Sequence, residues 1–251
     1  MIKAILHGAC GRMGRMISDI VSRDDAIEIV AGVDAFSSKY AQFPVYASLD
    51  ECKEEADVII DFSTASAMSG LFAYSAARGI PVVVCTTGLS DEQTAAMKET
   101  SARVAVLKSA NMSLGINLLQ TLLAEAAPKL AAAGFDIEVV EKHHNQKIDA
   151  PSGTALALAD SINDAMDGAY TYVYDRSARR QKRPEKEIGI SAVRGGTIVG
   201  DHDVIFAGED EVITFSHRAY SRAVFGKGAV EAAKFLAGKQ PGFYTMHDVL
   251  A

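Results

Sequence analysis

The sequence is poor in cysteine, has no long apolar run and has no excess of positive charge. Its three cysteines, Cys10, Cys52 and Cys85, form no C-x-x-C pair, so we expect no disulfide framework and a reducing, cytoplasmic environment. No stretch reaches the roughly 18 uncharged apolar residues of a transmembrane helix. The net charge of -7 argues against general binding to nucleic acids or anionic membranes.

What the chain does contain is the pattern of a two-domain globular protein. Its 251 residues are 49% apolar and 23% charged, which is typical of globular proteins. In the first part, apolar runs alternate with segments of helical spacing. We predict strands at residues 2–7, 27–33, 57–62, 81–85 and 104–107, and helices at residues 12–22, 66–78 and 91–99. Strands separated by helices of this length indicate βαβ units and a buried parallel sheet.

The pattern changes after Asn111. We predict helices at residues 114–130 and 155–166, and strands at residues 135–142, 188–194, 197–207 and 211–218. This order indicates an α+β domain with a mixed sheet. The tail predicts a helix at residues 228–236 and a turn at Pro241 and Gly242, which we place back on the first domain. The fold class is therefore α/β, with a Rossmann-type parallel-sheet domain and an α+β domain.

The segment GACGRMG at residues 8–14 follows the first predicted strand and opens the first predicted helix. Gly8 allows a tight turn, Gly11 lets the backbone approach a pyrophosphate, and Gly14 lets the helix pack closely. A pyrophosphate is favoured at a helix start, where backbone N–H groups and the helix dipole attract an anion. A glycine triplet alone is also compatible with an ordinary turn, so the surrounding pattern matters.

Asp34 ends the next predicted strand, where such folds place the acid that binds the adenosine ribose. Its carboxylate repels a 2′-phosphate, and Ala35 follows it rather than an arginine. We therefore expect NADH to be used at least as well as NADPH, while Arg12 keeps NADPH possible. The alternative interpretation is a solvated aspartate at a strand end.

Two further loops follow predicted parallel strands, where ligands of such sheets bind. They are Cys85-Thr86-Thr87 and Ser109-Ala110-Asn111-Met112. Their hydroxyls, amide and small residues suit a nicotinamide and its ribose. Each loop taken alone is equally compatible with a plain turn.

The run EKHHNQKIDAPSGTA at residues 141–155 suggests a carboxylate substrate and proton transfer. Imidazoles can pass a proton near neutral pH, and Lys147 can neutralise a carboxylate. Ser152 is a good N-cap for the next helix, whose start at Gly153 and Thr154 can face an anion. The alternative interpretation is an ordinary loop and helix cap.

Other sites are less well supported by the sequence. The histidines are not spaced as in zinc sites, so we expect no metal, and there is no G-x-S-x-G segment. We expect His202 and His217 to lie in strands or at an interface. A basic run is interpreted as a solvated loop or, alternatively, as a lid that attracts a dianion; it contains Arg176, Arg179, Arg180, Lys182, Arg183 and Lys186.

Taken in order, these motifs resemble the 4-hydroxy-tetrahydrodipicolinate reductase family, also called dihydrodipicolinate reductase. The resemblance covers nearly the whole chain and includes GACGRMG, DFS, TTG, SANMSLGIN, EKHHNQKIDAPSGTA, RGGTIVGDHDV, SRAVFGKGA and the final DVL. It implies hydride transfer from NADH or NADPH to ring carbon C4 of a cyclic dicarboxylate, with loss of water. The product is tetrahydrodipicolinate, in the diaminopimelate route to lysine.

The resemblance also assigns residues and domains. It implies His143 as proton donor and acceptor, Lys147 as second proton donor, and substrate contacts from His144, Gly153 and Thr154. Cofactor contacts are implied for Gly8, Ala9, Cys10, Gly11, Arg12, Met13, Asp34, Cys85, Thr86, Thr87, Ser109, Ala110, Asn111 and Met112. The dinucleotide-binding domain is expected at residues 1–112 and 221–251, and a substrate-binding and oligomerisation domain at residues 113–220, in a homotetramer.

Two departures from the family pattern bear on the cofactor. A glycine is usual where Cys85 stands, and no arginine follows Asp34. Two other functions stay open from the residues alone. One is a dehydrogenase for another small carboxylate, such as an aspartate-type amino acid, and the other is a non-catalytic NAD-sensing protein.

Overall fold

The computed structural model describes residues 1–36 and 41–251. The chain divides into two compact units. The first consists of Met1–Ser113 and Ala223–Ala251, and the second is Leu114–Arg222. Among the described residues, no helix is long and apolar enough to cross a membrane.

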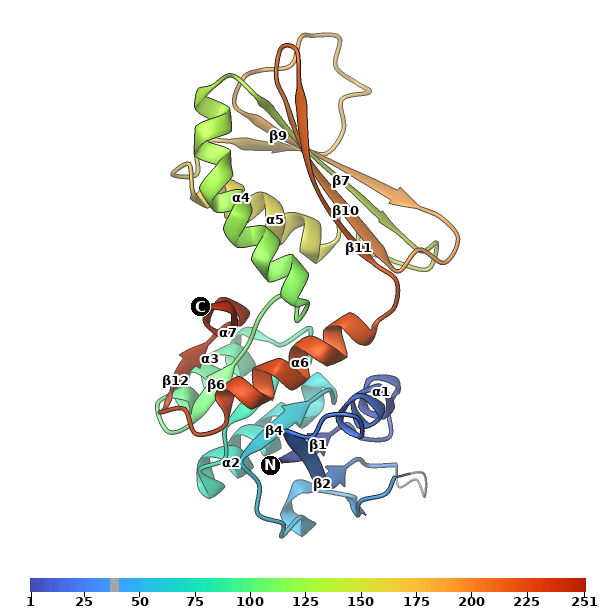
Figure 1. The fold of residues 1–251 in the computed structure, drawn as a ribbon, viewed down its shortest axis with the longest axis vertical. Coiled ribbons are helices and arrows are strands. Elements are labelled where there is room, and N and C mark those ends of the chain that lie inside the picture. Colours follow the sequence, from blue (N-terminus) through green and yellow to red (C-terminus); the bar gives the residue numbers. More distant parts are fainter. Residues whose placement is uncertain (37–40) are drawn as a thin grey trace. The chain divides into compact units, whose positions relative to one another are not determined.

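The first unit is built on a parallel sheet of seven strands in the order β12-β6-β5-β4-β1-β2-β3 (Figure 1). The strands are β1 (Ile2–His7), β2 (Ile27–Val33), β3 (Val45–Tyr46), β4 (Val58–Asp61), β5 (Val82–Val84), β6 (Ala105–Leu107) and β12 (Gly242–Tyr244). The order reverses direction at β1 and β4, which is the switch point at which such sheets bind ligands. The predicted Rossmann-type parallel sheet is confirmed.

Helices cover both faces of this sheet, which explains the uncharged runs of β4 and β5. They are α1 (Arg12–Val21), α2 (Met68–Arg78), α3 (Asp91–Ser101), α6 (Ala223–Leu236) and the short α7 (Met246–Leu250). Ile59 and Val82 pack in one core with residues of α2 and α3. Figure 1 shows α6 lying across the strands, beside α1, and α6 contacts α1, β4, β5 and β6.

The tail corrects two sequence predictions. The helix predicted at residues 228–236 begins earlier, at Ala223. Gly228 therefore lies inside the helix. A glycine is needed there because a Cβ would stand only 1.6 Å from the carbonyl oxygen of Met112. The turn predicted at Pro241 and Gly242 gives way to β12, which pairs with β6 from Gly242 onward. A strand of three residues is too short to show alternation in a sequence.

The second unit has a mixed sheet of five strands in the order β11-β10-β7-β9-β8. The strands are β7 (Asp136–His143), β8 (Thr171–Val173), β9 (Glu187–Arg194), β10 (Gly200–Ala207) and β11 (Val212–Ala219). β7 is antiparallel to β10 and parallel to β9. The predicted α+β domain with a mixed sheet is confirmed, and the strand predicted from residue 197 begins at Gly200.

Helices α4 (Leu114–Ala132) and α5 (Gly153–Asp164) pack together on this sheet. Leu123 of α4 and Leu158 of α5 are fully buried with Phe206 of β10. Side chains along β7 alternate strictly between partly exposed and buried, as expected for a strand with one covered face. The same alternation turns Glu141 and His143 inward, and this places the site described below.

The basic run lies in the connection between β8 and β9, outside the helices and strands, as the loop interpretation predicts, but three of its arginines are paired. Arg176 forms a two-pronged pair with Glu138, at 3.0 and 2.7 Å. Arg179 pairs with Glu187 at 2.9 Å, and Arg183 pairs with Glu138 at 3.1 Å. These three arginines are held by carboxylates of β7 and β9, whereas Arg180, Lys182 and Lys186 are exposed. The run is therefore a loop that is anchored to the sheet at three points.

Candidate functional site

The glycine loop of the first unit has the geometry of an anion-binding turn. Gly8 has a φ of 81°, and a Cβ there would lie 2.5 Å from the carbonyl oxygen of Phe62. A Cβ on Gly14 would lie 2.3 Å from the carbonyl oxygen of Gly8. Gly11 is the N-cap residue of α1 and has no side chain to cover the first-turn amides. The loop and the helix start therefore fit a pyrophosphate.

Asp34 follows β2 and is tied to this loop. One carboxylate oxygen accepts a hydrogen bond from the backbone N–H of Cys10 at 2.9 Å, and the other accepts from the N–H of Phe36 at 2.9 Å. A cavity of about 480 Å³ is lined by Gly8, Gly11 and Asp34, with Phe62 among its apolar lining residues. The described residues therefore offer room for a nucleotide at the predicted place.

The other two predicted loops follow β5 and β6, at the same carboxyl edge of the sheet. Several of their side chains are already used within the protein. The buried Thr86 hydroxyl donates to Asp61 at 2.7 Å, and the Ser109 hydroxyl accepts from the N–H of Met246 at 2.7 Å. Burial raises the pKa of the Cys85 thiol well above its ordinary value. The Thr86 and Ser109 hydroxyls therefore help to hold these two loops in place.

A buried polar network underlies these loops, and the sequence analysis missed it. Asp61, the last residue of β4, is fully buried. Its carboxylate accepts from His7 Nδ1 at 2.9 Å, from the Ser63 hydroxyl at 2.6 Å and from Thr86. Lys108 donates to the carbonyl oxygen of Thr86 at 2.7 Å. The network thus joins the ends of β1, β4, β5 and β6, and an acid ending an apolar strand was its sequence signal.

The charge of Asp61 is set by these partners. Burial alone raises the pKa of this carboxyl, but the hydrogen bond and charge of His7, with the hydroxyls of Ser63 and Thr86, lower it more. The net pKa is below its ordinary value, so Asp61 is a carboxylate at neutral pH. Burial lowers the pKa of Lys108, against the opposing effect of Cys85 and Asp61.

The second unit places a histidine against a buried carboxylate. His143 Nδ1 lies 2.6 Å from Glu141 Oε2. Arg194 donates to both oxygens of Glu141 at 2.7 Å, and the N–H of Ser152 donates to Oε1 at 2.9 Å. Burial raises the pKa of Glu141, but these hydrogen bonds lower it more, and the net pKa is below its ordinary value. A carboxylate at Nδ1 makes that nitrogen the donor, which leaves Nε2 of His143 for chemistry.

A second histidine lies beside the first. The rings of His143 and His202 meet edge to face, with centroids 5.2 Å apart. Burial, followed by the charge of His143, lowers the pKa of His202 to about 4. His202 Nε2 lies 3.2 Å from the Ser152 hydroxyl, which also accepts from the N–H of Ala155 at 3.1 Å. His202 and His217 lie in strands β10 and β11, as expected, and Ser152 is the N-cap of α5, as predicted.

The remaining predicted residues lie on the segment that connects β7 to α5. Lys147 pairs with Asp149 at 2.8 Å, and Gly153 and Thr154 are the first two residues of α5. Arg194 also donates to the carbonyl oxygen of Asp149 at 2.7 Å, which anchors this segment. The segment therefore holds together His143, His144, Lys147, Gly153 and Thr154. The sequence analysis assigned no role to Glu141 or Arg194.

Comparison with known proteins identifies the family. The family model described as "Dihydrodipicolinate reductase, N-terminus" matches residues 2–112, and "Dihydrodipicolinate reductase, C-terminus" matches residues 115–250. The chain belongs to the dihydrodipicolinate reductase family. The sequence resemblance is thereby confirmed.

Relatives in this family match over the whole chain. A 4-hydroxy-tetrahydrodipicolinate reductase of Caldanaerobacter subterraneus subsp. tengcongensis is 54% identical over 250 residues, covering 100% of this chain and 98% of the relative. One from Clostridium botulinum is 47% identical over 251 residues, again covering 100% and 98%. The dipicolinate-bound dihydrodipicolinate reductase from Paenisporosarcina sp. TG-14 has a TM-score of 0.77 at 25% identity and covers 100% of both chains.

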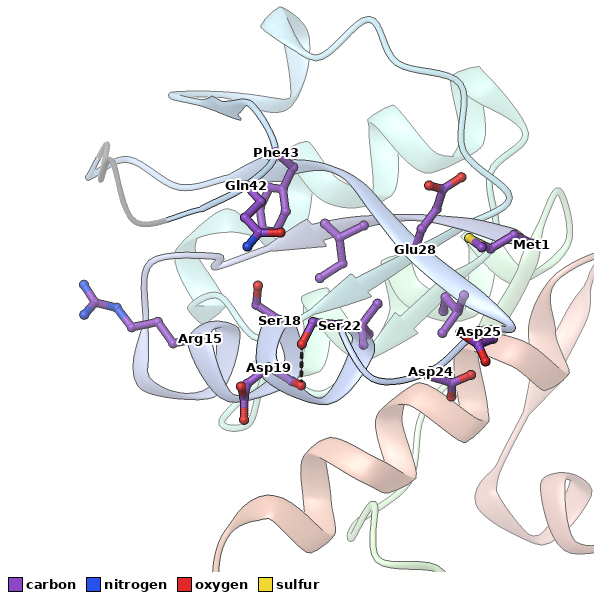
Figure 2. Close-up of a pocket in the computed structure, with 13 residues that line it drawn as sticks. Met1, Arg15, Ser18, Asp19, Ser22, Asp24, Asp25, Glu28, Gln42 and Phe43 are labelled. Carbon is purple, nitrogen blue, oxygen red and sulfur yellow. Dashed lines mark hydrogen bonds between the residues drawn. The ribbon is translucent and has the colours of Figure 1, made fainter.

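A second hollow in the first unit lies apart from the predicted residues. It has a volume of about 600 Å³, and Figure 2 shows Asp19, Asp24 and Glu28 among the acids around it. Asp24 is paired with Lys234 at 2.9 Å, and Asp19 is paired with Arg23 at 2.9 Å. None of the predicted site residues lines this hollow, so it is separate from the family site.

Proposed function

We propose that this protein is a 4-hydroxy-tetrahydrodipicolinate reductase, which uses NADH or NADPH to form tetrahydrodipicolinate in the diaminopimelate route to lysine. The proposal is supported by the reductases related to the chain over its full length. The observation that carries it is the segment between β7 and α5. At the end of β7, just before this segment, His143 lies 2.6 Å from Glu141, and the segment itself carries Lys147, which is paired with Asp149.

The first unit is the proposed dinucleotide-binding domain, and each predicted cofactor residue lies in it. The glycine loop and the start of α1 would hold the pyrophosphate, and Asp34 would face the adenosine ribose. A bound nicotinamide would supply the hydride. Because the carboxylate of Asp34 repels a 2′-phosphate and no arginine follows it, NADH is expected to serve at least as well as NADPH.

The second unit is the proposed substrate domain. Two substrate carboxylates suit Lys147, His144 and the start of α5 at Gly153 and Thr154, where the helix dipole favours an anion. Hydride addition to a conjugated imine leaves an anion that must be protonated. His143 is the proposed donor through Nε2, and Lys147 is the proposed second donor that assists the loss of water.

Two further expectations concern the protein in the cell. We place the reaction in the cytoplasm, in keeping with the three cysteines, which are free thiols in the structure. We also propose a homotetramer assembled through the second unit.

An absorbance assay of NADH oxidation tests the function, with the cyclic dicarboxylate generated in place. NADH is expected to be oxidised only when that substrate is present. Reduction of NAD⁺ by aspartate-type amino acids would instead indicate a different dehydrogenase. NADH binding with no turnover of any substrate would indicate a sensing protein. A preference for NADPH above about tenfold, close to 1.4 kcal/mol, would refute the role of Asp34.

Lys147→Ala is the matched variant for this assay. Turnover is expected to fall by about 100-fold or more, since a proton donor and a cation for the substrate are both removed. The dissociation constant of NADH is expected to stay unchanged, because Lys147 lies outside the proposed dinucleotide-binding domain. Equal losses in turnover and in NADH affinity would contradict this assignment of the two domains.

A further inference from the structure

Glu141 is a fully buried charge at the centre of the second unit's site. The two preceding inward side chains of β7, Ile137 and Val139, are apolar and also fully buried. Replacing an apolar residue with a carboxylate at such a position is costly unless each lone pair finds a donor. The contacts of Glu141 therefore indicate what the carboxylate is there to do.

Each oxygen of Glu141 accepts two hydrogen bonds. Oε1 accepts from the N–H of Ser152 at 2.9 Å and from Arg194 Nη2 at 2.7 Å. Oε2 accepts from His143 Nδ1 at 2.6 Å and from Arg194 Nη1 at 2.7 Å. The carboxylate is saturated, and its partners come from the end of β7, the end of β9 and the cap of α5.

These bonds connect to both proposed proton donors and to the start of α5. His143 is bound directly, and the N–H of Ser152 fixes the residue that precedes Gly153. Arg194 carries the connection onward to the carbonyl oxygen of Asp149, whose side chain holds Lys147. One buried carboxylate thus organises the proposed proton donors and the helix start together.

We propose that Glu141 is the positioning residue of this reductase: it holds the proton of His143 on Nδ1, so that Nε2 exchanges protons with the substrate. The proposal rests on the proposed function. Nε2 lies over the backbone of β10, where a Cβ on Gly200 would stand 3.1 Å away, so the ring has little freedom to turn. Arg194 balances the charge of Glu141 whether or not His143 carries its second proton.

Other charged groups near this pair would act on His143 as well. His202 on β10 meets its ring, and Lys147 and Asp149 lie on the connecting segment. A change in the pH profile of activity would therefore not identify Glu141 by itself. The tautomer of His143 is the more direct measurement, since it reports which ring nitrogen holds the proton.

Glu141→Gln tests the proposal, and Glu138→Gln is its matched control. All the partners of Glu141 are donors, so the NH₂ group of a glutamine would face donors in either orientation. Glu138 lies on the same strand and forms a similar two-pronged pair with Arg176, at 3.0 and 2.7 Å, but contacts no histidine. Glu141→Gln removes one carboxylate–arginine pair from β7, and Glu138→Gln removes two, because Glu138 also pairs with Arg183. Only Glu141→Gln affects His143.

Glu141→Gln is expected to lower kcat by about 100-fold or more while the KM for NADH stays unchanged. Glu138→Gln is expected to leave both values unchanged. A two-bond ¹H–¹⁵N spectrum, with His143 assigned by its absence in His143→Gln, is expected to show the Nδ1–H tautomer in the wild type and in Glu138→Gln. That tautomer is expected to be lost in Glu141→Gln.

If Glu141→Gln does not fold, Glu141→Asp replaces it, because it keeps the charge for Arg194 but shortens the reach to His143. Its kcat is expected to fall, with part of the His143 population changing tautomer. The proposal is overturned if the wild type shows the Nε2–H tautomer, or if the tested Glu141 variant keeps the wild-type tautomer and kcat. The spectrum needs no substrate, so its result stands apart from failure of the proposed function, which would appear as a wild type without reductase activity.

Discussion

Both units contain a buried histidine–carboxylate pair, and the two pairs have different surroundings. His7 ends β1 and meets Asp61 at 2.9 Å, and His143 ends β7 and meets Glu141 at 2.6 Å. Both carboxylates are fully buried. The other donors to Asp61 are the hydroxyls of Ser63 and Thr86 and the N–H of Ser63 at 3.2 Å. Glu141 is instead bound by an arginine.

The difference indicates what each pair is suited to do. An arginine keeps its charge at any working pH, so Glu141 stays neutralised while His143 gains or loses a proton. Apart from His7, Asp61 has neutral donors from neighbouring strand ends, and it joins the loops that carry the proposed cofactor residues. The first pair is suited to holding loops in place, and the second is suited to exchanging a proton.

Removing Arg194 should abolish the difference between the two histidine–carboxylate pairs and should have the largest effect on stability. Arg194→Met leaves Glu141 buried with His143 as its one remaining side-chain partner, and we expect a loss of about 3 to 5 kcal/mol in the free energy of unfolding. Urea unfolding measures it. Arg176→Met, which acts on the more exposed Glu138, is the control and should cost less. Equal losses of unfolding free energy in the two variants would show that the burial of Glu141 does not determine the cost of removing its arginine.

His202 sharpens the comparison because it is a buried histidine without a carboxylate. Its pKa is lowered from 6.5 to about 4, so below pH 6.5 the unfolded chain binds a proton that the folded chain does not. Stability is expected to fall between about pH 6.5 and pH 4 by about 3 kcal/mol from this residue. His202→Gln should remove that part of the pH dependence, as measured by urea unfolding at several pH values. An unchanged pH profile in the variant would contradict the assignment.

Asp61 and Glu141 also lose their contribution to stability as the pH falls, but at lower pH than His202. Their pKa values are lowered by folding, so the stability they provide is present above the ordinary carboxyl pKa and is lost as the pH falls through the folded values. This loss begins at about pH 4, where the carboxyls of the unfolded chain take up protons that the folded chain does not yet bind. The His202 effect is therefore separable, because it develops at higher pH.

Asp61→Asn should have the smallest effect on stability. Unlike Glu141→Gln, it should act on NADH affinity more than on kcat. The amide presents donors to His7, Ser63 and Thr86, and we expect a loss of about 2 kcal/mol. Because these contacts anchor the proposed cofactor loops, the dissociation constant of NADH should rise more than kcat falls. Fluorescence titration of NADH measures this. Asp57→Asn, in the exposed segment before β4, is the control, and equal affinities in the two variants would argue against the anchoring role.

Much of the first unit could be predicted because its signals are local. The positive φ of Gly8, the short strands around buried valines and the acid at Asp34 each follow from one stretch of chain. The strand β3 was missed because it has two residues, and β8 and β12 because each has three residues, the first of which is a threonine or a glycine. The equally short β5 and β6 could be predicted because they are uninterrupted apolar runs. The basic run is a loop, as predicted, but the pairing of its arginines was missed because partners such as Glu138 are distant in sequence.

The amino-acid sequence by itself determined the parallel sheet, the glycine turn, the capped start of α5 and the segment with His143 and Lys147. These depend on side-chain periodicity, allowed backbone angles and caps, which act over a few residues. The tertiary structure decided which charges meet. Arg194 reaches Glu141 because β7 and β9 are paired in a register that places Arg194 beside His143. That register is set by the burial of one whole face of the sheet. Such pairings depend on the folded sheet rather than on any one segment.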